Sequence, residues 1–171
     1  MDLQLRPALP SDLALLRAWD AKPHVIAARS SDGGMNWEEE LSRHPPWREL
    51  LIAEISGHAI GFMQIIDPAL EDSHYWGGMP AGLRAIDIWV GDEAALGQGY
   101  GTAMMRQAID RCFADPSVEA LLIDPLASNH RAHRFYQRLG FRPVERRVFG
   151  EDDCLIHRLD RGASKHPSAM F

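Results

Sequence analysis

The sequence has little of what marks several protein classes. Cys112 and Cys154 are its two cysteines in 171 residues, which is too few for a disulfide framework, so we expect two reduced thiols. No apolar run approaches the ~20 residues of a membrane helix, so we expect no membrane partner. The opening residues lack a basic stretch followed by an apolar one, which predicts no export signal and a cytoplasmic protein.

Positive charge is also scarce. The chain carries 18 Lys and Arg against 24 Asp and Glu, a formal net charge of −6, and it has no basic run. Nucleic-acid-binding proteins usually present a basic face to phosphates, so nucleic acid is not an expected partner. An acidic protein attracts cations, although the same charge can simply keep the protein soluble. The eight histidines show no metal-ligand spacing, so we expect no metal site.

The composition is that of a globular protein, with 46% hydrophobic and 25% charged residues. The length suits one domain, which we place at residues 1–161, with a flexible tail at 162–171. Alternating and apolar patterns predict strands at 3–6, 49–54, 58–66, 83–91, 118–124, 141–149 and 154–159. Helical spacing and capping residues predict helices after Ser11-Asp12 and at 37–43, 99–114 and 128–139. The order β-α-α-β-β-β-α-β-α-β-β predicts an α/β (α+β) fold, a mixed sheet flanked by helices.

The clearest chemical signal is a glycine-rich turn between the strand at 83–91 and the next helix. It reads Leu96-Gly97-Gln98-Gly99-Tyr100-Gly101. Alternate glycines let the backbone approach a ligand and adopt positive φ, and the amides at a helix start favour an anion such as a pyrophosphate. The turn lacks the Gly-Lys-Ser/Thr of a P-loop and the spacing of a dinucleotide fingerprint. The alternative is a loop that merely needs flexible residues.

A second motif lies downstream, where an Asn leads a helix that carries a Tyr and ends in Gly-Phe, over residues 129–141. With both motifs in the right order around the strand at 118–124, the chain resembles the GNAT superfamily of acyl-CoA N-acyltransferases. Leu96 departs from that family's usual Gln or Arg and leaves the backbone cradle intact. Within the superfamily the chain is most similar to the aminoglycoside 6'-N-acetyltransferases and to acyltransferases of siderophore assembly. The shared features are Leu-Gly-x-Gly-x-Gly, Ile86-Asp87, Asp124-Pro125 and His74-Tyr75-Trp76.

The resemblance implies a GNAT-like mixed, mostly antiparallel twisted sheet with helices on both faces. It also implies an acetyl-CoA-dependent N-acetyltransferase with a small-molecule amine as partner, acting as a monomer or homodimer. In the family, backbone amides of the strand before the glycine turn, here around Trp89 to Gly91, meet the oxyanion, and Gly91 is compatible with the bulge that this requires. The implied cofactor-binding positions are Trp89, Val90, Leu96, Gly97, Gln98, Gly99, Tyr100, Gly101, Thr102, Asn129 and Arg131.

Two aspartates are candidates for the amine side of the reaction. Asp87 lies mid-strand on the face of Leu83, Ala85 and Trp89, where a buried carboxylate needs a structural partner or a cationic ligand. We favour a catalytic role in binding the acceptor and taking its proton, directly or through water. Asp124 ends a buried strand, at the edge where open α/β sheets place ligands. The alternatives are an internal hydrogen bond for Asp87 and an Asp-Pro turn for Asp124.

The resemblance makes Tyr136 the proton donor to the CoA sulfur, and its hydroxyl is protonated at neutral pH. The alternative is a core aromatic, because Tyr136 also lies on the apolar stripe of its helix. Trp37 and Trp76 lie in irregular segments and could line an acceptor pocket or simply anchor packing. The first functional hypothesis is acetyl transfer to a small polycation such as an aminoglycoside. The others are a siderophore precursor or protein amine as acceptor, and a non-catalytic acyl-CoA-binding module.

Overall fold

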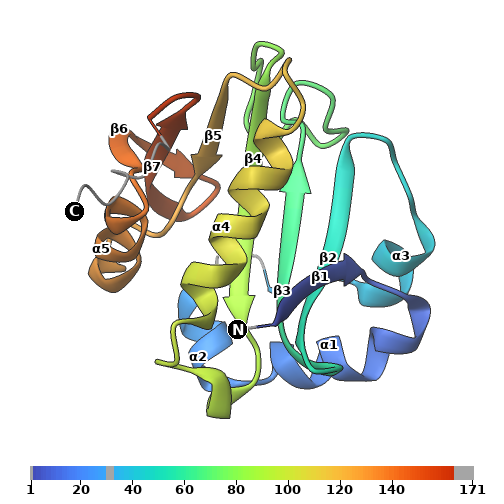
Figure 1. Cartoon of the computed structure of the whole chain (residues 1–171). Coiled ribbons are helices and arrows are strands. Elements are labelled where there is room, and N and C mark those ends of the chain that lie inside the picture. The colour runs from blue at the N-terminus through green and yellow to red at the C-terminus, as the bar shows by residue number, and fades with distance from the viewer. Residues whose placement is uncertain (1, 30–32, 164–171) are drawn as a thin grey trace.

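Seven strands form one sheet in the order β1-β2-β3-β4-β5-β7-β6 (Figure 1). The computed structural model describes residues 2–29 and 33–163, so the predicted tail at 162–171 lies outside the described residues from position 164 onward. Neighbouring strands are antiparallel except β4 and β5, which confirms the mixed, mostly antiparallel sheet. The strands are β1 (Leu3–Pro7), β2 (Arg48–Ile55), β3 (His58–Ile66), β4 (Leu83–Val90), β5 (Ala120–Ile123), β6 (Arg142–Phe149) and β7 (Asp152–Asp160).

Three of the helices lie between β1 and β2, one more than predicted. The unpredicted one is α2, which begins at Pro23, and proline is well suited to the first position of a helix because its missing N–H has no helical acceptor there. None of the helices among the described residues has the length and apolar character needed to cross a membrane. The helices are α1 (Leu13–Asp20), α2 (Pro23–Ala28), α3 (Trp37–Ser42), α4 (Tyr100–Phe113) and α5 (His130–Arg138).

The predicted capping of α1 by Asp12 is wrong in its geometry. The Asp12 carboxylate accepts a hydrogen bond from the amide of Leu9 at 2.7 Å and two from Arg6 at 2.7 and 2.8 Å. It therefore faces back toward β1 and makes no side-chain bond to the start of α1. The signal for a helix start was right, but the available guanidinium on β1 is a stronger partner for the carboxylate than a helix amide.

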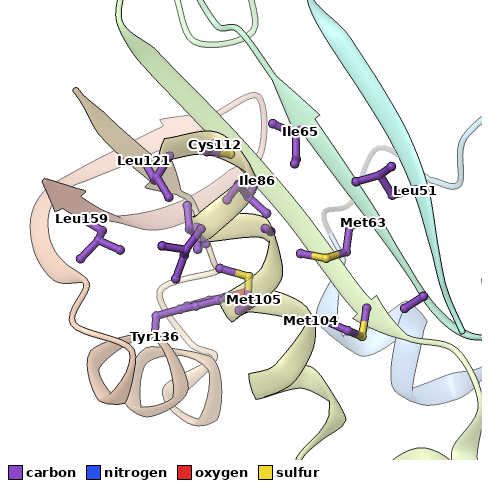
Figure 2. Packing of buried hydrophobic residues seen from close by; sticks show 14 of the residues in the cluster. Leu51, Met63, Ile65, Ile86, Met104, Met105, Cys112, Leu121, Tyr136 and Leu159 are labelled. Atoms are coloured by element: carbon purple, nitrogen blue, oxygen red, sulfur yellow. The ribbon is translucent and has the colours of Figure 1, made fainter. Parts of the chain in front are cut away.

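Helices cover both faces of the sheet. On one face α4 and α5 pack over the central strands, where Met63, Ile86 and Leu121 meet Met104 and Met105 (Figure 2). On the other face α1 and α3 pack over β2 and β3. The buried members of that second cluster are Ala8, Leu16, Trp19, Trp37, Leu41, Ile52 and Phe62.

The outer face of β4, opposite α4, is covered in two separate parts. Leu83 and Ala85 pack in a cluster with Trp76, which comes from the loop between β3 and β4. Trp89 packs at the margin of the α1/α3 cluster. Asp87 occupies the same row of the strand between these two clusters, because alternate residues of a strand share a face. The apolar cover of the sheet is therefore interrupted at Asp87.

Candidate active site

A cleft of about 1000 Å³ opens where β4 and β5 separate. The parallel ladder pairs Leu83–Ala85 with Ala120–Leu122. Beyond it β4 runs on to Val90, and the chain after β5 leads toward α5. Both of these segments line the cleft, and so does the glycine turn before α4. The separation of the two strands thus brings three distant parts of the sequence to one site.

The glycine turn offers backbone donors and open space. Gly97 and Gly99 have φ angles of +72° and +81°, which residues with a Cβ rarely adopt. A Cβ added at either position would meet no atom within 4 Å. The first bond into α4 runs from the Ala103 amide to the Gly99 carbonyl at 3.2 Å, so the amides of residues 100–102 precede regular helical pairing. Amides at a helix start suit an anionic group.

Most of the predicted site residues line this one cleft. They are Trp76, Asp87, Trp89, Val90, Leu96, Gly97, Gly99, Tyr100, Gly101, Thr102, Asp124, Asn129, Arg131 and Tyr136. Gln98 is exposed in the turn and is not part of the lining. Of the two tryptophans predicted to line an acceptor pocket, Trp76 is buried at the cleft wall with 5% of its surface exposed, so its packing role and its lining position coincide.

Trp37 lies behind the cleft wall. Its side chain is 2% exposed, and its ring packs edge-on against Phe62 with centroids 5.0 Å apart. Its indole N–H donates to Asp20 Oδ2 at 2.7 Å, and Asp20 does line the cleft. The position differs from the expectation that Trp37 itself lines an acceptor pocket, because the indole is needed to close the apolar cluster under α1 and α3.

The end of β4 leaves regular pairing at Gly91. The amides of Gly91 and Asp92 both donate to the carbonyl of Ile60, at 2.9 and 3.1 Å, so two residues oppose one, as in a bulge. A Cβ at Gly91 would lie 2.1 Å from the indole of Trp19. Glycine is therefore required here by the close approach of α1.

His24 of α2 fixes the last residue of β4. Its Nε2 lies 2.9 Å from the carbonyl oxygen of Val90, an acceptor, so this nitrogen carries the proton and donates. The N–H and C=O of one residue point to the same side of a strand, so the Val90 amide is directed away from β3. The Gly91 amide is already bonded to β3. Within the segment expected to supply an oxyanion donor, the Val90 amide is the one with the suitable direction.

Asp87 is held from the neighbouring strand. Gln64 stands opposite it in the β3–β4 register, and Gln64 Nε2 donates to Asp87 Oδ2 at 2.7 Å. Gln64 is 8% exposed, so its amide has little access to water. The internal hydrogen bond considered for Asp87 therefore exists, and it comes from a neutral donor, so it leaves the charge of the carboxylate in place.

Asp124 follows β5 and is half-buried. Tyr75 Oη donates to Asp124 Oδ2 at 2.7 Å. Burial and the nearby charge of Asp87 raise the pKa of Asp124 to about 7, while the Tyr75 hydrogen bond acts in the opposite direction. The Asp124 carboxyl can therefore gain or lose a proton near neutral pH.

Tyr136 of α5 is both a core residue and a cleft residue. Its side chain is 8% exposed and its ring lies 6.0 Å from that of Phe141 in the core cluster. Burial and the negative charges of Asp87 and Asp124 raise the pKa of Tyr136. Its hydroxyl therefore keeps its proton at neutral pH and can act as a donor.

Asn129 caps α5. Its side-chain oxygen accepts from the Ala132 amide at 3.1 Å. The cap uses the carbonyl half of the amide, so the NH2 half is a donor at the cleft lining. Arg131 is the second residue of α5, is exposed, and belongs to the same lining.

Two other carboxylates of the cleft, Glu40 and Asp20, are paired with arginines. Glu40 is paired with Arg48, whose side chain is 6% exposed. Asp20 lies 3.6 Å from Arg29 and also receives the Trp37 indole bond. Within residues 2–29 and 33–163, no group of three or more His, Cys, Asp or Glu side chains could hold a metal ion. Glu71 also lines the cleft, and it accepts hydrogen bonds from the amides of Ser73 and Tyr75. The side chains of Gln64 and Tyr75, which donate to Asp87 and Asp124, are neutral.

Sequence reasoning missed three of the residues that build this site. Gln64 carried a usable signal, because it interrupts an apolar strand next to the strand that Asp87 interrupts. Glu71 and His24 carried none, since their roles depend on the folded loop and on α2. The segment that holds Tyr75 carries part of the family resemblance, but the bond from Tyr75 to Asp124 follows from the tertiary fold.

Comparison with known proteins identifies the family of this chain. A family model described as an acetyltransferase (GNAT) domain matches residues 8–149. The aminoglycoside N(6')-acetyltransferase type 1 of Klebsiella pneumoniae is 34% identical over 145 residues, 80% of this chain and 72% of that protein. A kanamycin resistance protein of Rhizobium radiobacter is 40% identical over 60 residues, 35% of this chain and 56% of that protein. The crystal structure of aminoglycoside acetyltransferase AAC(6')-Ib with coenzyme A and kanamycin superposes with a TM-score of 0.83 and 26% identity, over 95% of this chain and 96% of that one. This chain therefore belongs to the GNAT family and is a GNAT-type N-acetyltransferase.

Proposed function

We propose that this acetyltransferase moves the acetyl group of acetyl-CoA to a primary amine of a small cationic molecule, with an aminoglycoside as the first acceptor to test. One observation carries the proposal. Asp87 and Asp124 line the same cleft as the glycine turn, and the groups that donate to them, Gln64 and Tyr75, are neutral. Two carboxylates whose charge is not cancelled by these donors favour a cationic ligand.

The glycine turn fits the cofactor. Bound acetyl-CoA supplies an activated thioester carbonyl to the cleft. The amides of residues 97–102 would hold its diphosphate, and the open space beside Gly97 and Gly99 leaves room for it. The NH2 group of Asn129 and the guanidinium of Arg131 line the same cleft and would meet the pantetheine arm and the phosphates.

The amine must lose a proton before it can attack. We assign this proton transfer to Asp87, directly or through one water, with Asp124 as the second anion that draws the ammonium into place. An ammonium between the two carboxylates lowers the pKa of both, since each ionised form then gains an opposite charge. The bound acceptor therefore keeps the two carboxylates ionised, and an ionised carboxylate is the form that can take the proton from the amine.

The reaction also needs a proton donor for the departing sulfur and a hydrogen-bond donor for the oxyanion. Tyr136 Oη holds a proton at the cleft lining, where a donor to the departing sulfur is needed. The Val90 amide, directed away from β3, is the donor for the developing oxyanion. His24 keeps that part of β4 in place through the Val90 carbonyl.

The names of the relatives support this class of acceptor. One is an aminoglycoside N(6')-acetyltransferase and another a kanamycin resistance protein. Polycationic aminoglycosides also match an acidic chain with a net charge of −6.

The test is a panel assay. The purified protein is incubated with acetyl-CoA and, in turn, with aminoglycosides, lysine peptides and hydroxylysine-like precursors, and thiol release is followed. Thiol release with aminoglycosides above the other amines supports the proposal. Preference for peptides or for hydroxylysine-like amines moves the acceptor to another class. Saturable CoA binding without thiol release on any amine identifies a non-catalytic binding module and rejects the proposed activity.

A further inference from the structure

Tyr75 is an exposed aromatic residue with an unusually fixed position. Its side chain is 41% exposed, yet three contacts hold it. Its amide donates to Glu71 Oε2 at 2.9 Å, its ring stacks on Phe149 with centroids 4.5 Å apart and planes 9° from parallel, and its hydroxyl donates to Asp124 Oδ2 at 2.7 Å. Backbone, ring and hydroxyl therefore have separate anchors.

The loop that carries Tyr75 is organised around Glu71. This carboxylate is 7% exposed and accepts hydrogen bonds from the amides of Ser73 and Tyr75, both at 2.9 Å. Trp76 follows and is buried against Phe149, with its carbonyl bonded by Arg147 at 3.1 Å. These contacts do not involve the Tyr75 hydroxyl, so the loop does not need that hydroxyl to hold its shape.

The surroundings of Asp124 show what the hydroxyl contributes. The charges that act on Asp124 include those of Asp87 on β4 and Asp152 on β7. The charge of Asp124 in turn acts on the Cys154 thiol of β7 and the Tyr136 phenol of α5. The carboxylates among them repel its charge, and the buried thiol and phenol are neutral at physiological pH. Tyr75 donates a hydrogen bond to Asp124, and a hydrogen bond to a carboxylate favours its ionised form.

We propose that Tyr75 is a positioning residue for the transfer reaction, whose hydroxyl holds the Asp124 carboxylate ionised and oriented toward the cationic acceptor. The inference rests on the proposed function for its kinetic consequence and on the Tyr75–Asp124 contact for its physical basis. It also assigns a role to the loop between β3 and β4, which presents a proton donor to the acceptor side of the cleft from outside the sheet.

The test variant is Tyr75→Phe, which keeps the ring on Phe149 and the amide bond to Glu71 and removes the oxygen alone. Loss of the donor raises the pKa of Asp124, so the acidic limb of the profile of kcat/KM against pH moves upward by about one pH unit. Rates at acidic pH fall about ten-fold, and rates on the alkaline plateau change little. In the Asp124→Asn background the same substitution has no further effect on the profile.

A readout without turnover accompanies the kinetics. Carboxyl carbons of 13C-labelled aspartates are titrated by NMR in the wild type and in Tyr75→Phe, with the Asp124 signal assigned by its loss in Asp124→Asn. The Asp124 midpoint rises in Tyr75→Phe, whereas in the control Tyr75→Phe/Asp124→Asn the other aspartate midpoints stay where Asp124→Asn alone puts them.

The outcomes are distinct. An unchanged pH profile together with an unchanged Asp124 midpoint overturns the role of Tyr75, even if wild-type turnover is high. A profile that shifts with the midpoint supports it. If the wild type turns over no amine, the proposed function fails, and the NMR midpoint alone then decides whether Tyr75 sets the ionisation of Asp124.

Discussion

The two parts of the cleft are built from different chemical material. The part for the cofactor is a backbone structure, in which Gly97 and Gly99 turn the chain beside open space and the amides of residues 100–102 precede the regular pairing of α4. The part for the acceptor is made of side chains, in which Gln64 and Tyr75 hold two carboxylates. One part depends on the absence of side chains and the other on their identity.

The difference teaches where change is tolerated. Backbone amides are present at every residue, so the cofactor part accepts many sequences as long as its glycines keep their conformation. The acceptor part depends on particular pairs of side chains. A loop or helix of another shape would place a different pair there. A chain of this family can therefore keep its cofactor while its acceptor changes.

The largest effect is expected from Gly99→Asp. An added carboxylate in the cradle repels the diphosphate, and at about 4 Å and an effective dielectric constant near 20 this amounts to roughly 4 kcal/mol. We expect CoA affinity, measured by titration calorimetry, to fall at least about 100-fold. Gly57→Asp is the matched control, because Gly57 has a similar φ of +77° and the same open surroundings but lies in the β2–β3 turn. Equal loss of affinity in both variants would mean that the turn is not the cradle.

The next largest effect is expected from a change in Tyr136. Tyr136→Phe removes the proton donor and keeps the buried ring, so kcat should fall about 100-fold, within the usual range for a general acid. CoA affinity should change by less than about two-fold, since the backbone cradle is untouched. A variant that unfolds earlier on heating while it retains the wild-type kcat would show that Tyr136 acts through packing alone.

The ionised carboxylate of Asp124 should also lower the stability of the folded protein. Because the pKa of Asp124 is raised to about 7, the folded protein binds more protons than the unfolded chain between about pH 4 and pH 7. Stability is therefore lost as pH rises through that window. Asp124→Asn should abolish this loss and raise Tm by about 3 °C at pH 8, with little gain near pH 4, while turnover falls. A lower Tm at pH 8 in the variant would show that the ionised carboxylate stabilises the fold instead.

The smallest effect is expected from Trp37→Phe. It removes the indole donor to Asp20 and leaves an aromatic ring against Phe62. We expect the KM for the acceptor to rise about three-fold, with kcat and CoA affinity unchanged, because Asp20 is bound by Arg29 as well. A change in CoA affinity instead of acceptor KM would assign Asp20 to the cofactor part of the cleft.

The same contrast decides what could be predicted from the sequence. The cofactor part is local: strand β4, the glycine turn and helix α4 follow one another, so spacing alone places Gly97 and Gly99 at a helix start. Asp87 could also be predicted from the sequence as a site residue, because a carboxylate within an apolar strand needs a partner or a ligand. The fold class followed from the order of the elements and was confirmed by the sheet.

Less of the acceptor part could be predicted from the sequence, because its contacts join residues far apart in the chain. Tyr75 reaches Asp124 only once the loop between β3 and β4 folds over β5, and Trp37 reaches Asp20 only once α3 packs against α1. Helix α2 is not among the predicted helices, and its start is marked by Pro23, a residue that suits the first position of a helix.

The most direct test of the account is a crystal structure of the chain with acetyl-CoA and an aminoglycoside. The account predicts the diphosphate at the amides of residues 97–102 and an amine nitrogen within hydrogen-bonding distance of Asp87 or Asp124. A structure in which the cofactor binds elsewhere and the glycine turn is empty would contradict it.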